Sequence, residues 1–152
     1  MKGIQRTFKL KDDKIAEPGD YLGPSLAQMM MSDGSNCWSM SSEKYVKAAV
    51  ANVEEKLAKS EKILTSRCNN PLKPGYRPKM DDSCELKANG LQYYQELVGV
   101  LRWMVELGRV DILLETSLMS AHLALPRLGH LEQLIHMVGY LKAHPNDNFL
   151  FG

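Results

Sequence analysis

Hydrophobic and polar residues alternate near the start of the chain, which is typical of β-strands. The alternation over residues 7–11 predicts one strand, and a second is expected over residues 21–31. Ser32-Asp33-Gly34 is a hairpin signal, because glycine accepts the positive φ of a tight turn, and residues 36–40 would form the returning strand. Residues 1–41 are therefore predicted to form a small antiparallel ribbon, which needs a partner surface for stability.

The pattern then changes to the spacing of an amphipathic helix over residues 42–59. Ser41 or Ser42 can cap its start, and its lysines lie largely opposite the apolar stripe. The stripe consists of Val46, Ala49, Val50, Val53 and Leu57. Residues 42–65 are assigned to this helical part. Residues 66–90 are interrupted by proline and glycine and are expected to form an extended, irregular segment draped over the rest of the chain.

Three further helices are predicted, over residues 91–107, 111–125 and 129–143. Gly108 and Pro126 supply the breaks between them. Short connections make these helices neighbours, so residues 91–152 are expected to form a helical bundle. The predicted fold class is α+β, mainly α: a short N-terminal antiparallel ribbon, a long helix, an irregular Pro-rich segment and a three-helix bundle.

Composition is that of an ordinary globular protein, with 152 residues, 44% hydrophobic residues and a net charge of +1. The three cysteines are widely spaced and include no C-x-x-C pair, which argues against a disulfide framework and against zinc. No apolar run approaches the ~20 residues of a membrane helix. An intracellular location, in cytoplasm or nucleus, is expected, and no membrane partner.

Charge is unevenly distributed along the chain. Residues 56–79 contain seven basic residues and one acidic residue, whereas residues 80–116 contain seven acidic and three basic residues. The basic residues of the first block are Lys56, Lys59, Lys62, Arg67, Lys73, Arg77 and Lys79. Blocks of opposite sign suggest different faces or partners, and the basic block could meet phosphate.

Several short motifs in the last third of the chain resemble one known family. They are Tyr94-Gln95-Glu96-Leu97-Val98-Gly99, Arg109-Val110-Asp111-Ile112, Ser117-Leu118-Met119-Ser120, and a His130-led segment that ends Tyr140-Leu141-Lys142. This series resembles the C-terminal part of the reverse transcriptase of copia-type LTR retrotransposons. Tyr21-Leu22-Gly23 is similar to a strand near the end of that family's palm. The chain has Gly139 where Arg is usual in the family, and Val110 where Pro is usual.

The resemblance implies a fragment of a Pol polyprotein that covers the end of the palm, the thumb and the connection, without the RNase H domain. Family-motif positions with an expected structural role are Tyr21, Leu22, Gly23, Tyr94, Leu97, Gly99, Arg109, Asp111, His130, Tyr140, Leu141 and Lys142. Palm and RNase H segments would be partners of this chain in the polyprotein.

Polymerase chemistry requires two divalent cations held by carboxylates. In the family these ligands come largely from an aromatic-x-Asp-Asp hairpin, which is not found here. The adjacent acids Asp12-Asp13 and Asp81-Asp82 lack the flanking apolar strand. The chain by itself is therefore expected to be no enzyme and to need no cofactor, with Mg²⁺ belonging only to the full-length enzyme that it resembles.

Two functions remain open from the sequence. The first is binding of an RNA–DNA or DNA duplex, for which the candidate residues are Lys44, Lys47, Lys56, Lys59, Lys62, Arg67 and Trp38. An ordinary solvated helix face is the alternative reading of the lysines, and packing against a helix is the alternative for Trp38. The second function is that of a non-enzymatic helical module, or a degenerate remnant, whose apolar stripes bind protein or a second copy of the chain.

Overall fold

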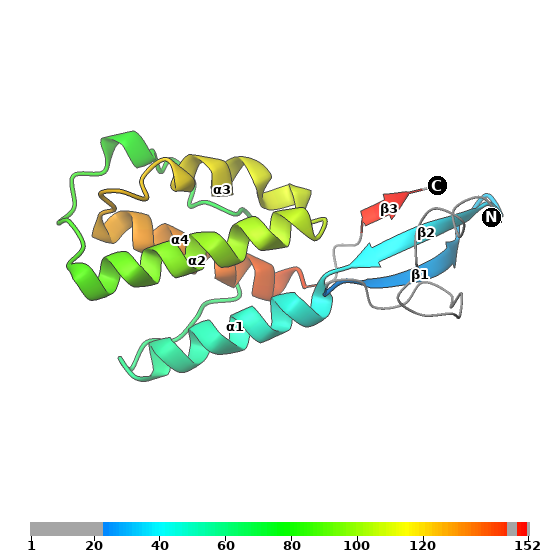
Figure 1. Cartoon of the computed structure of the whole chain (residues 1–152), viewed down its shortest axis with the longest axis horizontal. Coiled ribbons are helices and arrows are strands. Elements are labelled where there is room, and N and C mark those ends of the chain that lie inside the picture. The colour runs from blue at the N-terminus through cyan, green and yellow to red at the C-terminus, as the bar shows by residue number, and fades with distance from the viewer. Residues whose placement is uncertain (1–22, 146–148, 152) are drawn as a thin grey trace, which may run out of the picture.

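A computed structural model describes residues 23–145 and 149–151, and in these ranges the chain has the expected mainly helical α+β organisation. A β ribbon projects from one end of a body of helices (Figure 1). The expected strand over residues 7–11, the Asp12-Asp13 pair, and the motif residues Tyr21 and Leu22 lie outside the described residues.

The ribbon is built on the predicted hairpin. Strand β1 (Ser25–Met30) pairs antiparallel with β2 (Asn36–Ser41), and Gly34 has a φ of 84° in the turn. A third strand, β3 (Phe149–Phe151), pairs antiparallel with the other edge of β2. Residues 149–151 fall within the range expected to be helical, and three residues are too few to display the alternation that marks a strand.

Three long helices enclose the core. They are α1 (Glu43–Ala58), α2 (Ala88–Glu106) and α4 (Leu128–Ala143). The expected stripes face inward, and the fully buried side chains include Val46, Tyr94, Leu101, Leu134, Val138 and Leu141. Because each helix contributes one apolar face, the core forms where the three faces meet.

Two helix boundaries differ from the prediction. Helix α2 begins at Ala88 rather than residue 91, since Gly90 lies in the first turn, where it can be accommodated. The helix expected over residues 111–125 is shorter: a 3₁₀ turn, η3 (Val110–Ile112), leads into α3 (Leu113–Ser120). The chain leaves the helical path before Pro126, consistent with the extended conformation that proline imposes on the residue before it.

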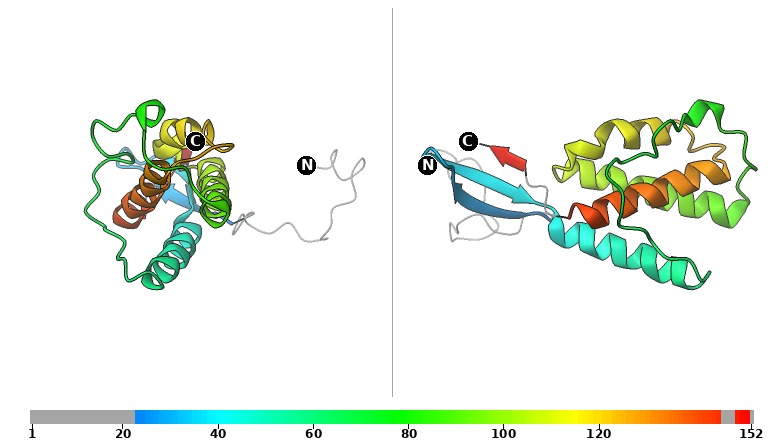
Figure 2. Two further views of the ribbon diagram at one scale, coloured as in Figure 1. Left: turned by 90° about the vertical axis from the view of Figure 1, so that its left-hand side faces the viewer. Right: turned by 180° about the vertical axis from the view of Figure 1, so that it is seen from behind.

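The irregular segment that joins α1 to α2 crosses the helical body alongside α4 (Figure 2). We call residues 60–87 the link. It contains one 3₁₀ turn, η2 (Pro78–Met80), and an isolated bridge between Glu85 and Arg127. The link runs along α4 in the opposite direction to the helix, as its contacts described below show.

Candidate nucleic-acid interface

The lysines expected to bind nucleic acid on α1 are mostly engaged with acidic side chains. Three of them form ion pairs: Lys47 with Glu43, Lys56 with Glu96, and Lys59 with Glu55. Lys56 also lies over the ring of Tyr93, with its Nζ atom 4.0 Å from the ring centroid. Lys44 is exposed on the same helix. Because phosphate would have to compete with neighbouring carboxylates, α1 is a weaker phosphate-binding surface than its lysine content suggests.

The basic side chains of the link differ from those of α1. The five that belong to the basic block of residues 56–79 are exposed, and none forms an ion pair with a described residue. They are Lys62, Arg67, Lys73, Arg77 and Lys79. Only Lys62 and Arg67 were singled out from the sequence, although the other three belong to the same basic block. The signal that could have found them is their position between prolines and glycines, which predicts exposed chain.

Two depressions in the surface bring link cations together in pairs. Lys62 and Lys73 line a hollow of about 210 Å³ beside the end of α1 and α4, together with one acidic residue, Glu132, so the hollow keeps a net positive charge. Arg77 and Lys79 line a groove of about 380 Å³ between η2 and the end of α3. Residues separated along the link therefore face common openings, which an extended polyanion could span.

Hydrogen bonds fix the middle of the link to α4. The Lys73 backbone N–H donates to Gln133 Oε1 at 3.1 Å. His136 Nε2 lies 3.1 Å from the carbonyl oxygen of Asn70 and must donate to it, since a carbonyl only accepts. His136 Nδ1 is then left to accept from the Cys68 thiol, 3.5 Å away. Burial lowers the pKa of His136, which favours this neutral form.

Close backbone contact holds the link near the other end of α4. Gly139 lies so close to Thr65 that a Cβ atom on it would be 2.4 Å from the Thr65 carbonyl oxygen. Burial raises the pKa of the Cys68 thiol, which is only 2% exposed, and this keeps the thiol protonated. The link thus contacts α4 directly at Gly139, and a side chain at this position would push the link away from the helix.

A polar network fixes the last part of the link at the start of α4. Ser83 Oγ donates to Asp81 Oδ1 at 2.5 Å and accepts from the Gly129 backbone N–H at 2.8 Å. Tyr76 donates its hydroxyl to Asp81 Oδ2 at 2.6 Å. Burial acts to raise the pKa of Asp81, but the hydrogen bonds from Ser83 and Tyr76 outweigh it, so the carboxyl pKa is lowered. At Gly129 a Cβ would lie 1.9 Å from this carboxylate, so the network requires glycine there.

His130 joins the same network from inside α4. Its Nδ1 accepts from the Arg127 backbone N–H at 3.0 Å, which caps the helix, and its Nε2 lies 2.9 Å from the carbonyl oxygen of Pro78. These contacts give His130 a structural role at the start of α4. His130 is 2% exposed, and its ring packs against the tilted His122 ring, with centroids 4.2 Å apart.

Trp38 lies far in space from the link cations. It is half-buried in the middle of β2, opposite Gln28 and Phe151. Helix α1 separates the ribbon from the start of the link, and its 16 residues span about 24 Å. The ribbon that carries Trp38 and the link therefore do not form one continuous site, because the ribbon projects from one end of the helical body (Figure 1).

The motif residues within the described ranges lie in different surroundings. Tyr94, Leu97 and Leu141 are buried in the core, while Gly99 faces open space and Gly23 adopts a φ of 118°. Lys142 pairs with Glu54 at 2.7 Å, which ties α4 to α1.

The motif arginine is also structural. Arg109 is fully buried and donates to both carboxylate oxygens of Asp111, at 2.9 and 2.7 Å, and to the His144 carbonyl at 2.8 Å. Burial acts to raise the pKa of Asp111, but Arg109 and the hydroxyl of Tyr140 lower it. This cluster joins the turn after α2 to the end of α4.

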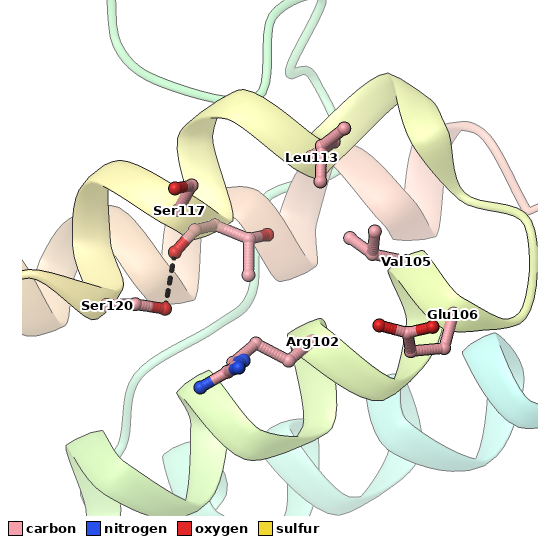
Figure 3. A pocket seen from close by; sticks show the side chains of 7 residues that line it. Arg102, Val105, Glu106, Leu113, Ser117 and Ser120 are labelled. Carbon is pink, nitrogen blue, oxygen red and sulfur yellow. Dashed lines mark hydrogen bonds between the residues drawn. The ribbon is translucent and has the colours of Figure 1, made fainter.

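One further hollow, of about 270 Å³, lies between α2 and α3 (Figure 3). Its α2 wall carries Arg102 and Glu106, and on its α3 wall Ser120 Oγ donates to the Thr116 carbonyl at 2.7 Å. A guanidinium and a carboxylate one helical turn apart cancel each other's charge. This hollow therefore offers no net attraction for phosphate.

Other chemistry can be assessed for the described residues alone. Residues 23–145 and 149–151 include no group of three or more His, Cys, Asp or Glu side chains placed to hold a metal ion. Cys37, Cys68 and Cys84 are free thiols. Among the helices in these ranges, none has the length and apolar character needed to cross a membrane.

Comparison with known proteins adds no relative: no family model, no curated protein and no solved structure matches the chain.

Proposed function

We propose that the link binds the phosphate backbone of an RNA–DNA or DNA duplex, and that the chain is a fragment of a copia-type reverse transcriptase in which this binding would serve primer and template positioning. The observation that carries the binding proposal is the set of five exposed cations without ion-pair partners among the described residues, on a segment fixed to α4. The family proposal rests on the sequence motifs quoted above.

Fixing the link before binding matters for affinity. A flexible segment would lose backbone conformational freedom of about 1–2 kcal/mol per residue when ordered on a ligand. Here the contacts of Cys68, Asn70 and Lys73 with α4 already order it. The cations are therefore presented at a smaller entropic cost than on a free loop.

Catalysis is not part of the proposal. In the full-length enzyme, palm carboxylates would hold Mg²⁺, and the palm and RNase H segments would be partners of this chain. Template-directed nucleotide incorporation by the purified chain, abolished by a chelator, would refute this part of the proposal.

Duplex binding can be tested by its salt dependence. Fluorescence anisotropy with a labelled RNA–DNA hybrid of defined length would give the dissociation constant at several salt concentrations. Each phosphate neutralised adds about 0.9 to the log–log slope, so engagement of the five cations at residues 62–79 predicts a slope of about −4 to −5. A dissociation constant that does not change with salt contradicts phosphate binding.

The interface can be located with two variants of equal charge. Lys62→Gln, Arg67→Gln and Lys73→Gln together remove three link cations, whereas Lys47→Gln, Lys56→Gln and Lys59→Gln remove three ion-paired lysines of α1. We expect the link variant to reduce the slope by about 3 and the α1 variant to reduce it much less. Equal effects would show that only total charge matters, and a larger effect of the α1 variant would place the interface on the helix.

A second candidate function is protein binding or self-association, and exposed apolar side chains favour it. Met30 is 76% exposed on β1, and Leu113 and Leu114 are 52% and 65% exposed on α3. Apolar surface of this kind marks interaction sites when it is contiguous. Sedimentation equilibrium at low and high salt distinguishes the two functions, because apolar association persists at high salt whereas phosphate binding weakens.

A further inference from the structure

The groove between η2 and the end of α3 is lined largely by apolar side chains and rings. Apolar side chains line much of it, including Pro78, Met80 and Leu118. Met80 is 72% exposed and Leu118 41% exposed, so the fold leaves both in contact with solvent. The groove volume of about 380 Å³ falls within the range of small-molecule sites.

Two rings line the same groove, and each is held by contacts with neighbouring residues. The Tyr76 hydroxyl donates to Asp81, which fixes the end of that ring. The His122 ring packs at an angle of 31° against the His130 ring, which is itself held by hydrogen bonds to the backbone. Burial, together with the neighbouring His130, lowers the pKa of His122, so its ring is neutral at neutral pH. A fixed ring provides a surface for stacking without further ordering.

The charged side chains that line the groove are both basic, although Asp81 and Asp82 line the hollow next to it. Arg77 and Lys79 line it, and no acidic side chain does. The nearest carboxylate along the chain, Asp81, is directed at Tyr76 and Ser83. An occupant that combines a flat apolar surface with adjacent negative charge would complement all these features.

We propose that this groove holds one unpaired base of a nucleic-acid strand whose phosphates lie on the link. A nucleotide unites a planar π-face with a phosphate, and binding of single strands commonly combines stacking on side-chain rings with a basic track for the backbone. The inference rests on the proposed function and refines it: a strand with an unpaired base binds more tightly than a fully paired duplex of similar charge.

The contribution of the base can be separated from that of the phosphates. The probes are a labelled oligothymidine of about 12 nucleotides and an abasic strand of the same length, which carries the same backbone charge. We expect the oligothymidine to bind about 5- to 100-fold more tightly, the range for one stacked base. Equal affinities for the two strands would overturn the inference.

Filling the groove tests its location. Ala121 lines the groove and is exposed, so Ala121→Leu adds bulk there without changing charge. Ala124→Leu is the matched control, because Ala124 is exposed and does not line the groove. We expect Ala121→Leu to abolish the preference for oligothymidine over the abasic strand and to leave duplex affinity unchanged, whereas Ala124→Leu preserves both. A preference that survives in Ala121→Leu would overturn the inference.

Further outcomes distinguish the inference from the function on which it rests. If removal of Lys62, Arg67 and Lys73 weakens duplex binding but the groove variant changes nothing, phosphate binding stands and the base site is refuted. If removal of these cations has no effect on any strand, the proposed function fails as well. Binding of an acidic apolar peptide that Ala121→Leu abolishes, with no binding of oligothymidine, would assign the groove to a protein partner and overturn the inference.

Discussion

Replacing Gly139 with alanine tests the close approach of the link to α4. A Cβ at this position would lie 2.4 Å from the carbonyl oxygen of Thr65 and 3.2 Å from Cys68 Sγ. In the interior of a helix, alanine is normally about 1 kcal/mol more favourable than glycine. Here the added atom meets backbone, which cannot rotate away as a side chain can, so the link must move off the helix.

The size of the effect follows from what the link covers. Leu64 and Cys68 are 4% and 2% exposed. Uncovering a buried leucine costs about 1.5–3 kcal/mol, and the gain in helix propensity offsets about 1 kcal/mol of this. We expect Gly139→Ala to lower the free energy of unfolding by about 0.5–2 kcal/mol, which corresponds to a melting temperature lower by roughly 1–8 °C.

Urea denaturation followed by far-UV circular dichroism would measure the change, with Gly99→Ala as the matched control. Gly99 lies within α2, and a Cβ there would meet no atom within 4 Å. That substitution should therefore raise the free energy of unfolding by up to about 1 kcal/mol. If both variants gained stability equally, the link would not be packed against α4 at Gly139, and the reasoning would be refuted.

Two further predictions concern buried polar groups. Tyr94→Phe removes a hydroxyl that donates to a buried carbonyl at 2.7 Å and should lower the free energy of unfolding by about 1 kcal/mol, whereas Tyr93→Phe removes a buried hydroxyl with no partner among the described residues and should lower it by much less. Urea denaturation of both variants checks the difference, and an equal loss in the two would contradict it. Burial lowers the pKa of His136, so as the pH falls the unfolded chain binds a proton at this histidine before the folded chain does. The contribution of His136 to stability is complete above about pH 6.5 and falls as the pH drops toward the folded-state pKa. The melting temperature of wild-type protein should therefore fall more steeply below pH 6.5 than that of His136→Gln, and parallel profiles for the two proteins would argue against it.

Much of the fold follows from local sequence signals. The stripe of Val46, Val50, Val53 and Leu57 predicted α1, and Gly34 marked the hairpin turn. These signals are local because helix periodicity and turn geometry depend on residues a few positions apart. The pairing of residues 149–151 with β2 joins segments more than one hundred positions apart, so nothing in the short strand itself reveals it.

The candidate site was less predictable, because ion pairing depends on the folded arrangement. Glu43 and Glu55 lie four residues from Lys47 and Lys59, and their helical spacing already allowed those pairs. The pair of Lys56 with Glu96 links α1 to α2 and has no local signature. Charge counting along the chain located the basic block correctly, but it could not separate paired lysines from unpaired ones.

The structure of the link connects stability to the proposed binding function. Gly139→Ala changes no charge, so the number of phosphates that the link can neutralise stays the same, and the salt slope of duplex binding should stay the same. Affinity should nevertheless fall, because a link released from α4 must be ordered again when it binds. Anisotropy titrations at several salt concentrations would show parallel lines for wild-type protein and Gly139→Ala, with the variant weaker throughout. A change in slope would mean instead that the position of the link determines which cations reach the phosphates.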